Sequence, residues 1–457
     1  MTFTTNIFLI GLLPWCLLLI YLTRKLNQVK CVLLVLANIV FYIWGGVGAF
    51  AFICVFSVGV WIITRLVYRV KNKLLLALSI MITVLPLALV KYTSFVISNI
   101  NSLCGSNIEF RGFLMPIGIS FFTFEAISLI VDTHKGEVED KVSLLRVYLY
   151  LSFFPTVTSG PIVRYNTFQD GLANAVERVE WKAAERIVIG LGKKVLIADK
   201  LSVLADYYFN GVAAGNDYSC VGLWIGSVAY TLQLYFDFSG YSDMAIGIGE
   251  LLGFHIPENF NAPYRANSIS DFWRRWHISL SRWFRDYVYI SLGGNRCKPI
   301  RHVLNLFVVW LLTGIWHGAD WSFVLWGLGY FVLLFAEKYI TVMKKIGDKW
   351  FGHVYALFFI NLLWVLFRAD NMSVAGRYLA GMFGANGIGA AEDILMPFIP
   401  FVLVACTLCL PWEKILSRVI DNGFVQLVRE IAIIAIAAIA ICAVVNASYT
   451  PYIYGNF

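Results

Sequence analysis

Charged side chains are scarce in this sequence of 457 residues: Asp, Glu, Lys and Arg together make up 14% of it, against about 25% in an ordinary soluble domain. Hydrophobic residues reach 59%, where about 45–50% is usual. So few charges do not cover a globule of this length, and the composition also excludes disordered, collagen-like and disulfide-rich chains. The composition therefore predicts a polytopic membrane protein.

Cysteine occurs in a number and a spacing that predict neither a disulfide framework nor a metal site. The nine cysteines are an odd number at scattered positions, and most lie in apolar runs, where cysteine behaves as a small hydrophobic residue. Cys406 and Cys409 form a CxxC pair without a second pair, whereas a zinc site normally needs four ligands. We expect no bound metal and no bound cofactor.

Several signatures of other protein classes are missing. The chain has no GxxxxGK[ST] phosphate loop, no dinucleotide-binding fingerprint and no GxSxG elbow, which leaves ATP-driven transport and a serine acyl-enzyme without support. The net charge is +8, but the basic residues lie in short clusters between apolar runs, as in the cytoplasmic loops of membrane proteins. This distribution argues against a nucleic-acid-binding surface.

Apolar runs recur along the whole chain. They lie at 7–22, 31–44, 49–63, 74–100 and 113–131, and near 144–157, 187–209, 221–236, 240–256, 303–335, 354–367, 395–411 and 430–447. With about 20 residues needed for each crossing, they predict an all-α protein with about 10–12 transmembrane helices. Because several runs contain Gly, Pro or a charge, we expect some re-entrant and interfacial helices as well. No linker or internal repeat divides residues 1–457, which predicts a single membrane domain.

The orientation of the first run follows from its flanks. It is followed by Arg24 and Lys25 and lacks a small-residue cleavage site, so it is expected to be a retained helix. Since no basic residue precedes it, the N-terminus is expected to face outward. The next four runs agree with this orientation.

His317 is the strongest catalytic candidate because it is an ionisable residue in an apolar segment, LTGIWHGADWSFVLWG. A helix beginning at Val303 would place it about 21 Å along its axis, roughly two-thirds of the way through a hydrocarbon core of ~30 Å. A neutral imidazole at that depth can take a proton from a hydroxyl as a general base. The alternative is a structural histidine hydrogen-bonded between helices. Asp320 either orients this imidazole or is solvated.

The segment 268–296 has the pattern of an amphipathic helix. Arg274, Arg275, Arg282 and Arg285 fall within an arc of roughly 100°, with His277 at its border. The opposite side carries the apolar residues Trp273, Trp276, Leu280, Trp283, Phe284 and Tyr287. Such a helix is expected at the cytoplasmic interface. Its arginines either meet lipid phosphates, which the pattern alone favours, or grip a phosphorylated cosubstrate.

Two carboxylates, Asp237 and Asp243, lie in a further apolar region, YFDFSGYSDMAIGIGE. A charge in such surroundings is a functional candidate by default. The sequence leaves two interpretations open: the carboxylates line a polar cavity, or they cap helices and pair within the bundle.

The chain resembles the membrane-bound O-acyltransferase (MBOAT) superfamily, and within it the alginate O-acetyltransferase branch of bacterial polysaccharide acetylases. The matching stretches are PIGISFFTFEAISLIVDTHKG at 116–136, SGPIVRYNTF at 159–168, the long stretch from LYFDFSGYSDM to SLGGNR at 234–296, and LTGIWHGADWSFVLWG at 312–327. Their order and spacing extend over most of the chain. The resemblance implies a helical membrane fold with a central tunnel beside the family histidine.

The resemblance also implies roles for individual residues. His317 occupies the histidine of the WHG motif and is the implied catalytic histidine. His277 matches the second family histidine, in WRRWH, which either shares in catalysis or organises the tunnel. In such proteins a cytosolic acyl thioester donates its acyl group to a hydroxyl reached from outside. The residues that match donor-side contacts are Trp273, Arg274, Arg275 and Arg282.

The final stretch, SYTPYIYGNF, resembles a short aromatic motif whose tyrosine is proposed to carry the acyl group to a partner enzyme. Tyr454 occupies that place, although Gly455 departs from the aromatic residue often found there. A phenol, with a pKa near ~10, accepts an acyl group only when a base assists it. The alternative is an aromatic residue of the membrane interface.

The resemblance thus implies acetyl transfer from a cytosolic thioester, acetyl-CoA, across the bacterial plasma (inner) membrane to an extracytoplasmic polysaccharide. The implied partners are a periplasmic SGNH-like acetyltransferase or esterase, the polysaccharide acceptor and membrane lipids. Two alternatives remain at this stage. One is a transporter or flippase for a polysaccharide precursor, which would predict internal repeats, and the other is a lipid O-acyltransferase of the same superfamily.

Overall fold

The computed structural model describes residues 3–23, 26–138, 142–173, 181–390, 393–410, 423–446 and 453. Every regular element among these residues is helical. Seven of the described helices are long and apolar enough to cross a membrane. They are Gln28–Gly45, Val47–Arg69, Lys73–Cys104, Pro299–His317, Trp321–Tyr339, Phe351–Arg368 and Gly423–Asn446, and shorter apolar helices lie at Ile7–Leu22 and Ile394–Leu408. The predicted all-α, multi-pass fold class is confirmed, whereas the central tunnel and the outward N-terminus stay predictions.

The chain divides into two compact units. The first comprises most of the chain up to Ile187 together with Ser242–Pro257, and the second comprises Val188–Tyr241 and Glu258–Ile453. Helix α10, Cys220–Leu251, contributes its first part to the second unit and its last part to the first. The expected single domain over 1–457 stays a prediction.

The first unit is built around one buried helix. Its elements are η1 Ile7–Leu12, α1 Leu13–Leu22, α2 Asn27–Gly45, α3 Val47–Arg69, α4 Lys73–Cys104, α5 Ile119–Lys135, α6 Leu144–Leu151, α7 Tyr165–Ala173 and the start of α8, Trp181–Gly192. Every residue of α5 from Ile119 to Thr133 is buried, as expected of a helix that is covered on all sides. Helices α3, α4, α6 and α7 pack against it.

The second unit contains the predicted site. Its elements are η2 Lys193–Ala198, α9 Asp199–Ala213, the first part of α10, η3 Pro263–Arg265, α11 Ile269–Arg275, α12 Ile278–Trp283, η4 Phe284–Tyr289, α13 Pro299–His317, α14 Trp321–Tyr339, α15 Thr341–Lys344, η5 Ile346–Asp348, α16 Phe351–Arg368, α17 Met372–Met382, η6 Asp393–Phe398, α18 Ile399–Leu408 and α20 Gly423–Asn446. Helix α14 is central, because α11, α13, α16 and α17 all pack against it.

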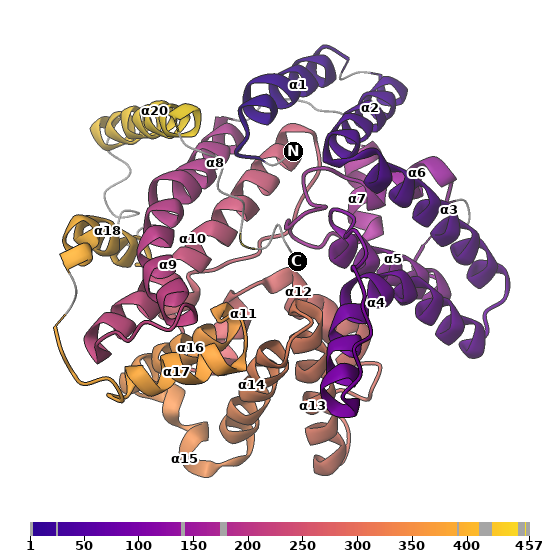
Figure 1. Cartoon of the computed structure of the whole chain (residues 1–457). Coiled ribbons are helices and arrows are strands. Elements are labelled where there is room, and N and C mark those ends of the chain that lie inside the picture. Colours follow the sequence, from indigo (N-terminus) through magenta and orange to yellow (C-terminus); the bar gives the residue numbers. More distant parts are fainter. Residues whose placement is uncertain are drawn as a thin grey trace. The chain divides into compact units, whose positions relative to one another are not determined.

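Helices α13 and α14 form an antiparallel hairpin and lie side by side (Figure 1). Two glycines allow the backbones to touch: a Cβ on Gly327 would meet the carbonyl oxygen of Trp310 and lie 3.1 Å from the Cα of Gly314. The apolar run 303–335 is therefore two helices joined at residues 318–320 rather than one long crossing. This contact sets the distance between the helix that ends at His317 and its neighbour.

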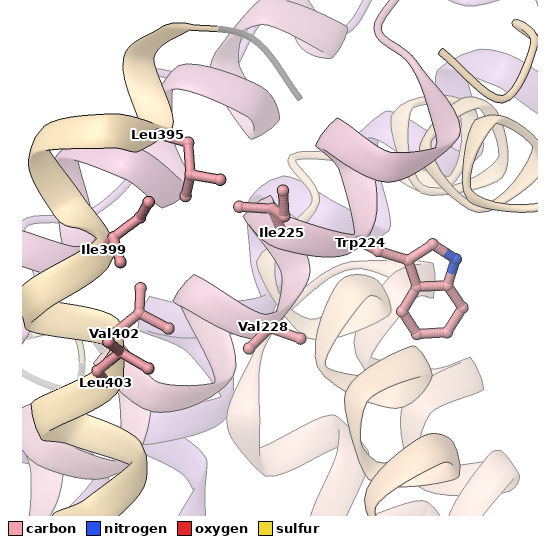
Figure 2. Close-up of a pocket in the computed structure, with 7 residues that line it drawn as sticks. All are labelled: Trp224, Ile225, Val228, Leu395, Ile399, Val402 and Leu403. Atoms are coloured by element: carbon pink, nitrogen blue, oxygen red, sulfur yellow. The ribbon is translucent and has the colours of Figure 1, made fainter. Parts of the chain in front are cut away.

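An apolar groove lies between the first part of α10 and α18. Figure 2 shows Ile225 and Val228 of α10 facing Ile399 and Val402. The cavity volume is about 310 Å³, and Trp224, Leu395 and Leu403 complete its lining. Val228 lies ten residues, or about 15 Å along the helix, before Phe238.

We expect Gly327→Ala to destabilise the protein by about 1–3 kcal/mol, because the added methyl group meets Trp310 and Gly314 of the facing helix. Thermal unfolding of the purified protein in detergent measures the effect. Gly376→Ala in α17 is the matched control, since a methyl group there meets nothing within 4 Å, and Ala is favoured over Gly in a helix by about 0.5–1 kcal/mol. Equal unfolding midpoints for the two variants would contradict the close contact.

Candidate active site

His317 is the last residue of α13 and is buried, with 2% of its surface exposed. The helix begins at Pro299, directly after the basic residues Arg296 and Lys298. At ~1.5 Å per residue, His317 lies about 27 Å from that basic end. The expected distance of His317 from the basic loop along one helix agrees with the structure, whereas its depth in the membrane stays a prediction.

Three aromatic rings surround the His317 imidazole. The ring centroids of Trp316 and Trp326 lie 4.8 Å from it, and that of Phe367 lies 5.2 Å from it. The interplanar angles of 71° to 78° are those of edge-to-face contacts, which aromatic pairs prefer over face-to-face stacking. These rings exclude bulk water from the imidazole.

A path of touching rings leads from His317 back toward the basic end of the hairpin. Trp326 contacts Tyr330 at a centroid distance of 5.1 Å, and Tyr330 contacts Trp273 of α11 at 4.9 Å. Trp273 also contacts Trp310 of α13 at 4.7 Å. The predicted donor-side residue Trp273 therefore lies within the same aromatic cluster as His317, and we call the series Trp273, Tyr330, Trp326 and His317 the ring path.

The segment around His277 is not the continuous helix that the sequence predicts. Helix α11 ends at Arg275, the next residue is extended, and His277 has a φ of 44° before α12 begins. The chain leaves the helix because its backbone bonds elsewhere: Asn261 N–H donates to the Arg275 carbonyl at 2.9 Å, and Ile278 N–H donates to the Asn259 carbonyl at 3.0 Å. The helical expectation was wrong because this pairing with distant residues replaces the local ladder.

The partition of side chains along this segment is nevertheless the predicted one. Arg274, Arg282 and Arg285 are exposed. The apolar residues of the opposite side, Trp273, Trp276, Leu280, Trp283, Phe284 and Tyr287, are all buried. They pack within the protein, so the segment is part of the structural core as well as of a surface.

Asn259 determines which nitrogen of His277 carries the proton. The Asn259 side-chain oxygen accepts hydrogen bonds from the Ser279 N–H at 3.2 Å and the Ser279 hydroxyl at 2.9 Å. Because a backbone N–H only donates, the atom at this position is the amide oxygen. His277 Nδ1 lies 3.1 Å from the same oxygen, so Nδ1 carries a hydrogen and Nε2 keeps its lone pair. His277 is fully buried, and this burial lowers the pKa of its imidazole to about 3.

Trp316 lies between the two histidines. Its ring centroid is 6.3 Å from that of His277 and 4.8 Å from that of His317. Phe238 of α10 covers His277 from another direction, with a centroid distance of 4.8 Å and an interplanar angle of 89°. The structure thus brings both predicted catalytic histidines into one aromatic environment.

A polar cavity of about 410 Å³ lies beside α11. Its lining includes the cations Arg274, Arg275 and Lys344 and the carboxylates Asp271 and Glu337. The Arg275 guanidinium bonds Asp271 at 2.9 Å, while Arg274 is exposed. Two of the three predicted donor-side arginines therefore share one cavity, and the third, Arg282, is exposed elsewhere on the same segment.

Glu337 of α14 links this helix to α11 through hydrogen bonds. Its carboxylate accepts the Ile269 N–H at 2.6 Å, the Ser270 N–H at 2.9 Å and the Ser270 hydroxyl at 2.6 Å. Two residues later in α14, the Tyr339 hydroxyl bonds His302 Nδ1 at 2.7 Å. The polar cavity consequently lies at the basic end of the α13–α14 hairpin, at the opposite end from His317.

The two carboxylates of the apolar region YFDFSGYSDMAIGIGE, Asp237 and Asp243, are paired. Asp237 bonds Lys194 at 2.7 Å, and Asp243 bonds Arg186 at 3.1 Å, which confirms pairing within the bundle. Asp320 caps α14, because its side chain accepts the backbone N–H two residues later at 2.8 Å.

The predicted acyl carrier, Tyr454, lies outside the described residues. The residue before it, Ile453, is described, and its N–H donates to the second carboxylate oxygen of Asp237 at 2.8 Å.

Comparison with known sequences decides the family. The sequence profile of the membrane-bound O-acyltransferase family, MBOAT, matches residues 103–374, a stretch that contains both histidines, the ring path and the polar cavity. The chain belongs to the MBOAT family. The protein is therefore a multi-pass membrane-bound O-acyltransferase, and the alternative of a transporter is set aside.

The MBOAT chain is similar to several bacterial enzymes of the cell envelope. It is 40% identical over 401 residues to the probable alginate O-acetylase of Azotobacter vinelandii, which covers 84% of this chain and 78% of that protein. It is 36% identical over 386 residues to the peptidoglycan O-acetyltransferase of Helicobacter pylori, covering 77% and 69% respectively. It is also 32% identical over 246 residues to the teichoic acid D-alanyltransferase of Bacillus subtilis, covering 51% and 61%.

Three residues of this MBOAT site escaped sequence reasoning. Asn259 and Glu337 act through hydrogen bonds to residues 18 to 68 positions away, and no local pattern marks such partners. Lys194 could have been found, since it is a charge within the apolar run 187–209 and such charges are functional candidates by default.

The buried His277 predicts a pH dependence of stability. Its pKa falls from about 6.5 to about 3 in the folded protein, so between these pH values the unfolded chain binds a proton at His277 that the folded chain does not. Stability is therefore fully present above pH ~6.5 and is lost as the pH falls, by up to about 1.4 kcal/mol per pH unit. We expect the unfolding midpoint of the wild type to fall more steeply between pH ~6.5 and ~4.5 than that of His277→Asn. Parallel slopes would contradict a neutral buried imidazole.

Proposed function

We propose that this MBOAT protein transfers an acetyl group from acetyl-CoA in the cytosol to a hydroxyl group, for O-acetylation of a polysaccharide outside the bacterial plasma membrane. The observation that carries the proposal is the ring path, which runs from Trp273, the sequence neighbour of the cavity-lining Arg274, to His317. The names of the relatives pair an acetyl or alanyl group with alginate, peptidoglycan or teichoic acid. A cell-envelope polymer is accordingly the acceptor class we infer.

The polar cavity is the proposed site for the phosphates of the donor. Arg274, Arg275 and Lys344 supply positive charge there, and guanidinium groups suit phosphate oxygens because their N–H groups form a planar fork. Arg296 and Lys298 directly precede the start of α13 at Pro299, and such basic residues are typical of cytosolic loops. In this proposal the acyl end of the donor follows Trp273 and the ring path toward His317, and Arg282 contacts the donor outside the cavity.

His317 is the proposed general base of the transfer. It takes the proton of the acceptor hydroxyl, and the hydroxyl oxygen then attacks the carbonyl carbon of the thioester. The bond between carbon and sulfur breaks, and the thiolate receives the proton, leaving an ester and free CoA. His277, whose Nε2 keeps its lone pair, is the proposed hydrogen-bond acceptor that orients the hydroxyl. Because His317 is only 2% exposed, one of its surrounding rings must shift to admit the substrates.

Tyr454 is the proposed first acceptor. Its phenol would take the acetyl group as an ester, and a polymer hydroxyl would then attack that ester and return a proton to the tyrosine oxygen. A periplasmic SGNH-like enzyme is the proposed partner for this second transfer. Support comes from Ile453, whose N–H is bonded to Asp237, because the next residue of α10, Phe238, contacts His277.

A lipid acceptor has less support. The groove of Figure 2 is lined by apolar side chains, as a lipid chain requires. Its α10 residues, however, precede Phe238 by ten or more positions, which corresponds to about 15 Å of helix. The groove is therefore remote from His277 along α10, and a polysaccharide hydroxyl remains the acceptor we propose.

His317→Ala tests the general base. We expect it to lower the release of CoA and of acetylated product by about 10²–10⁴-fold, with the amount of protein in the membrane unchanged. Radiolabelled acetyl-CoA and purified protein in lipid nanodiscs provide the assay. His302→Ala on the same helix is the matched control, since His302 bonds Tyr339 at the opposite end of α13. Transfer at the wild-type rate in His317→Ala would make this histidine structural.

Arg274→Ala tests the donor cavity. We expect the KM for acetyl-CoA to rise by about 10-fold or more, the value of one hydrogen bond to a charged group, with little change in kcat. Arg285→Ala is the control, because Arg285 is similarly exposed but pairs with Asp286 outside the cavity. If both variants keep the wild-type KM, the donor phosphates bind elsewhere.

A further inference from the structure

The second unit contains a buried cluster of charges that the proposed chemistry does not use. Lys194 of η2 lies 2.7 Å from carboxylate oxygens of both Asp199 and Asp237. The side chains of Lys194 and Asp237 are each 2% exposed. Burying two charges is unfavourable unless they are paired and their remaining hydrogen-bonding positions are used. The hydrogen bond made by the second carboxylate oxygen of Asp237 therefore shows what else this pair contacts.

The second oxygen of Asp237 binds a distant part of the chain. It accepts the N–H of Ile453 at 2.8 Å, across 216 positions of sequence. An ionised carboxylate only accepts hydrogen bonds and has two oxygens for doing so. Lys194 lies against one oxygen, which leaves the other oxygen as an acceptor for a backbone N–H.

This contact lies next to the candidate active site. Phe238 follows Asp237 directly in α10, and consecutive Cα atoms are about 3.8 Å apart. The Phe238 ring contacts His277 at a centroid distance of 4.8 Å. Asp237, which binds Ile453, is therefore one residue away in α10 from the side chain that contacts His277.

We propose that the Lys194–Asp237 pair is a docking point that holds the segment containing Ile453 beside His277. Asp237 is a positioning residue for Ile453, and Lys194 orients the Asp237 carboxylate through the ion pair. This inference rests on the proposed acyl transfer to the segment. A single charge-assisted hydrogen bond suits that role, because it orders the segment and still allows it to leave with an acyl group.

Hydrogen–deuterium exchange tests the docking point without reference to catalysis. In the wild type, a peptide spanning residues 447–457 should retain a slowly exchanging amide at Ile453. In the double variant Asp237→Leu with Lys194→Met, that amide should exchange at least about 10-fold faster. Both members of the fully buried pair are removed together because removing one partner of such a pair is strongly destabilising, whereas the Asp199 side chain, which loses Lys194, is 22% exposed. The matched control is Asp243→Leu with Arg186→Met, which removes an ion pair of the same helix and should leave the exchange at Ile453 unchanged.

Acetyl-transfer assays on the same variants distinguish the role of the docking point from the role of Tyr454 as acyl acceptor. The Asp237→Leu and Lys194→Met variant should lose acetyl transfer, and Tyr454→Phe should lose it while keeping the slow amide. If the folded double variant exchanges the Ile453 amide at the wild-type rate, the docking point is overturned, whether or not Tyr454 accepts the acetyl group. A lost slow amide with undiminished transfer overturns the positioning role. Full transfer in Tyr454→Phe, with the slow amide present, refutes only the tyrosine relay of the proposed function.

Discussion

The energetic cost of leaving a charge or a polar group unpaired inside an apolar protein organises this structure. The Lys194 ammonium lies between Asp199 and Asp237, and the Glu337 carboxylate accepts three hydrogen bonds at the start of α11. Each such arrangement joins elements that are remote in sequence. Because an unpaired buried group costs about 1–3 kcal/mol, and more when charged, these pairings also determine where the neighbouring side chains lie.

The hairpin of α13 and α14 places a polar cavity with cationic side chains at one end and an aromatic environment at the other, one helix length apart. Cationic side chains gather at the basic end, and His317 lies at the other, within aromatic rings. In the proposed reaction, the charged donor group and the histidine base need opposite environments, since one must be solvated and the other must be dry. The close contact at Gly314 and Gly327 allows the two helices to pack directly against each other.

Much of this could be predicted because it depends on local composition. The scarcity of charge and the repeated apolar runs predicted an all-α membrane protein, and the motif order placed His317 on one helix with the basic loop at its other end. The division between exposed arginines and buried aromatic residues in 268–296 was also confirmed. The assumption of one continuous helix there was wrong, because residues 259–261 take up the backbone bonds that a helix would have used.

The sequence by itself determined the class of protein, the family and the residue types available for chemistry, because hydrophobicity and motif spacing are properties of short stretches. Only the tertiary structure decided which groups meet: that Asn259 directs the proton of His277, that Asp237 pairs with Lys194, and that Ile453 reaches the same carboxylate. The physical reason is that a hydrogen bond depends on a separation of about 3 Å in space, and chain positions up to 216 residues apart carry no local mark of that proximity.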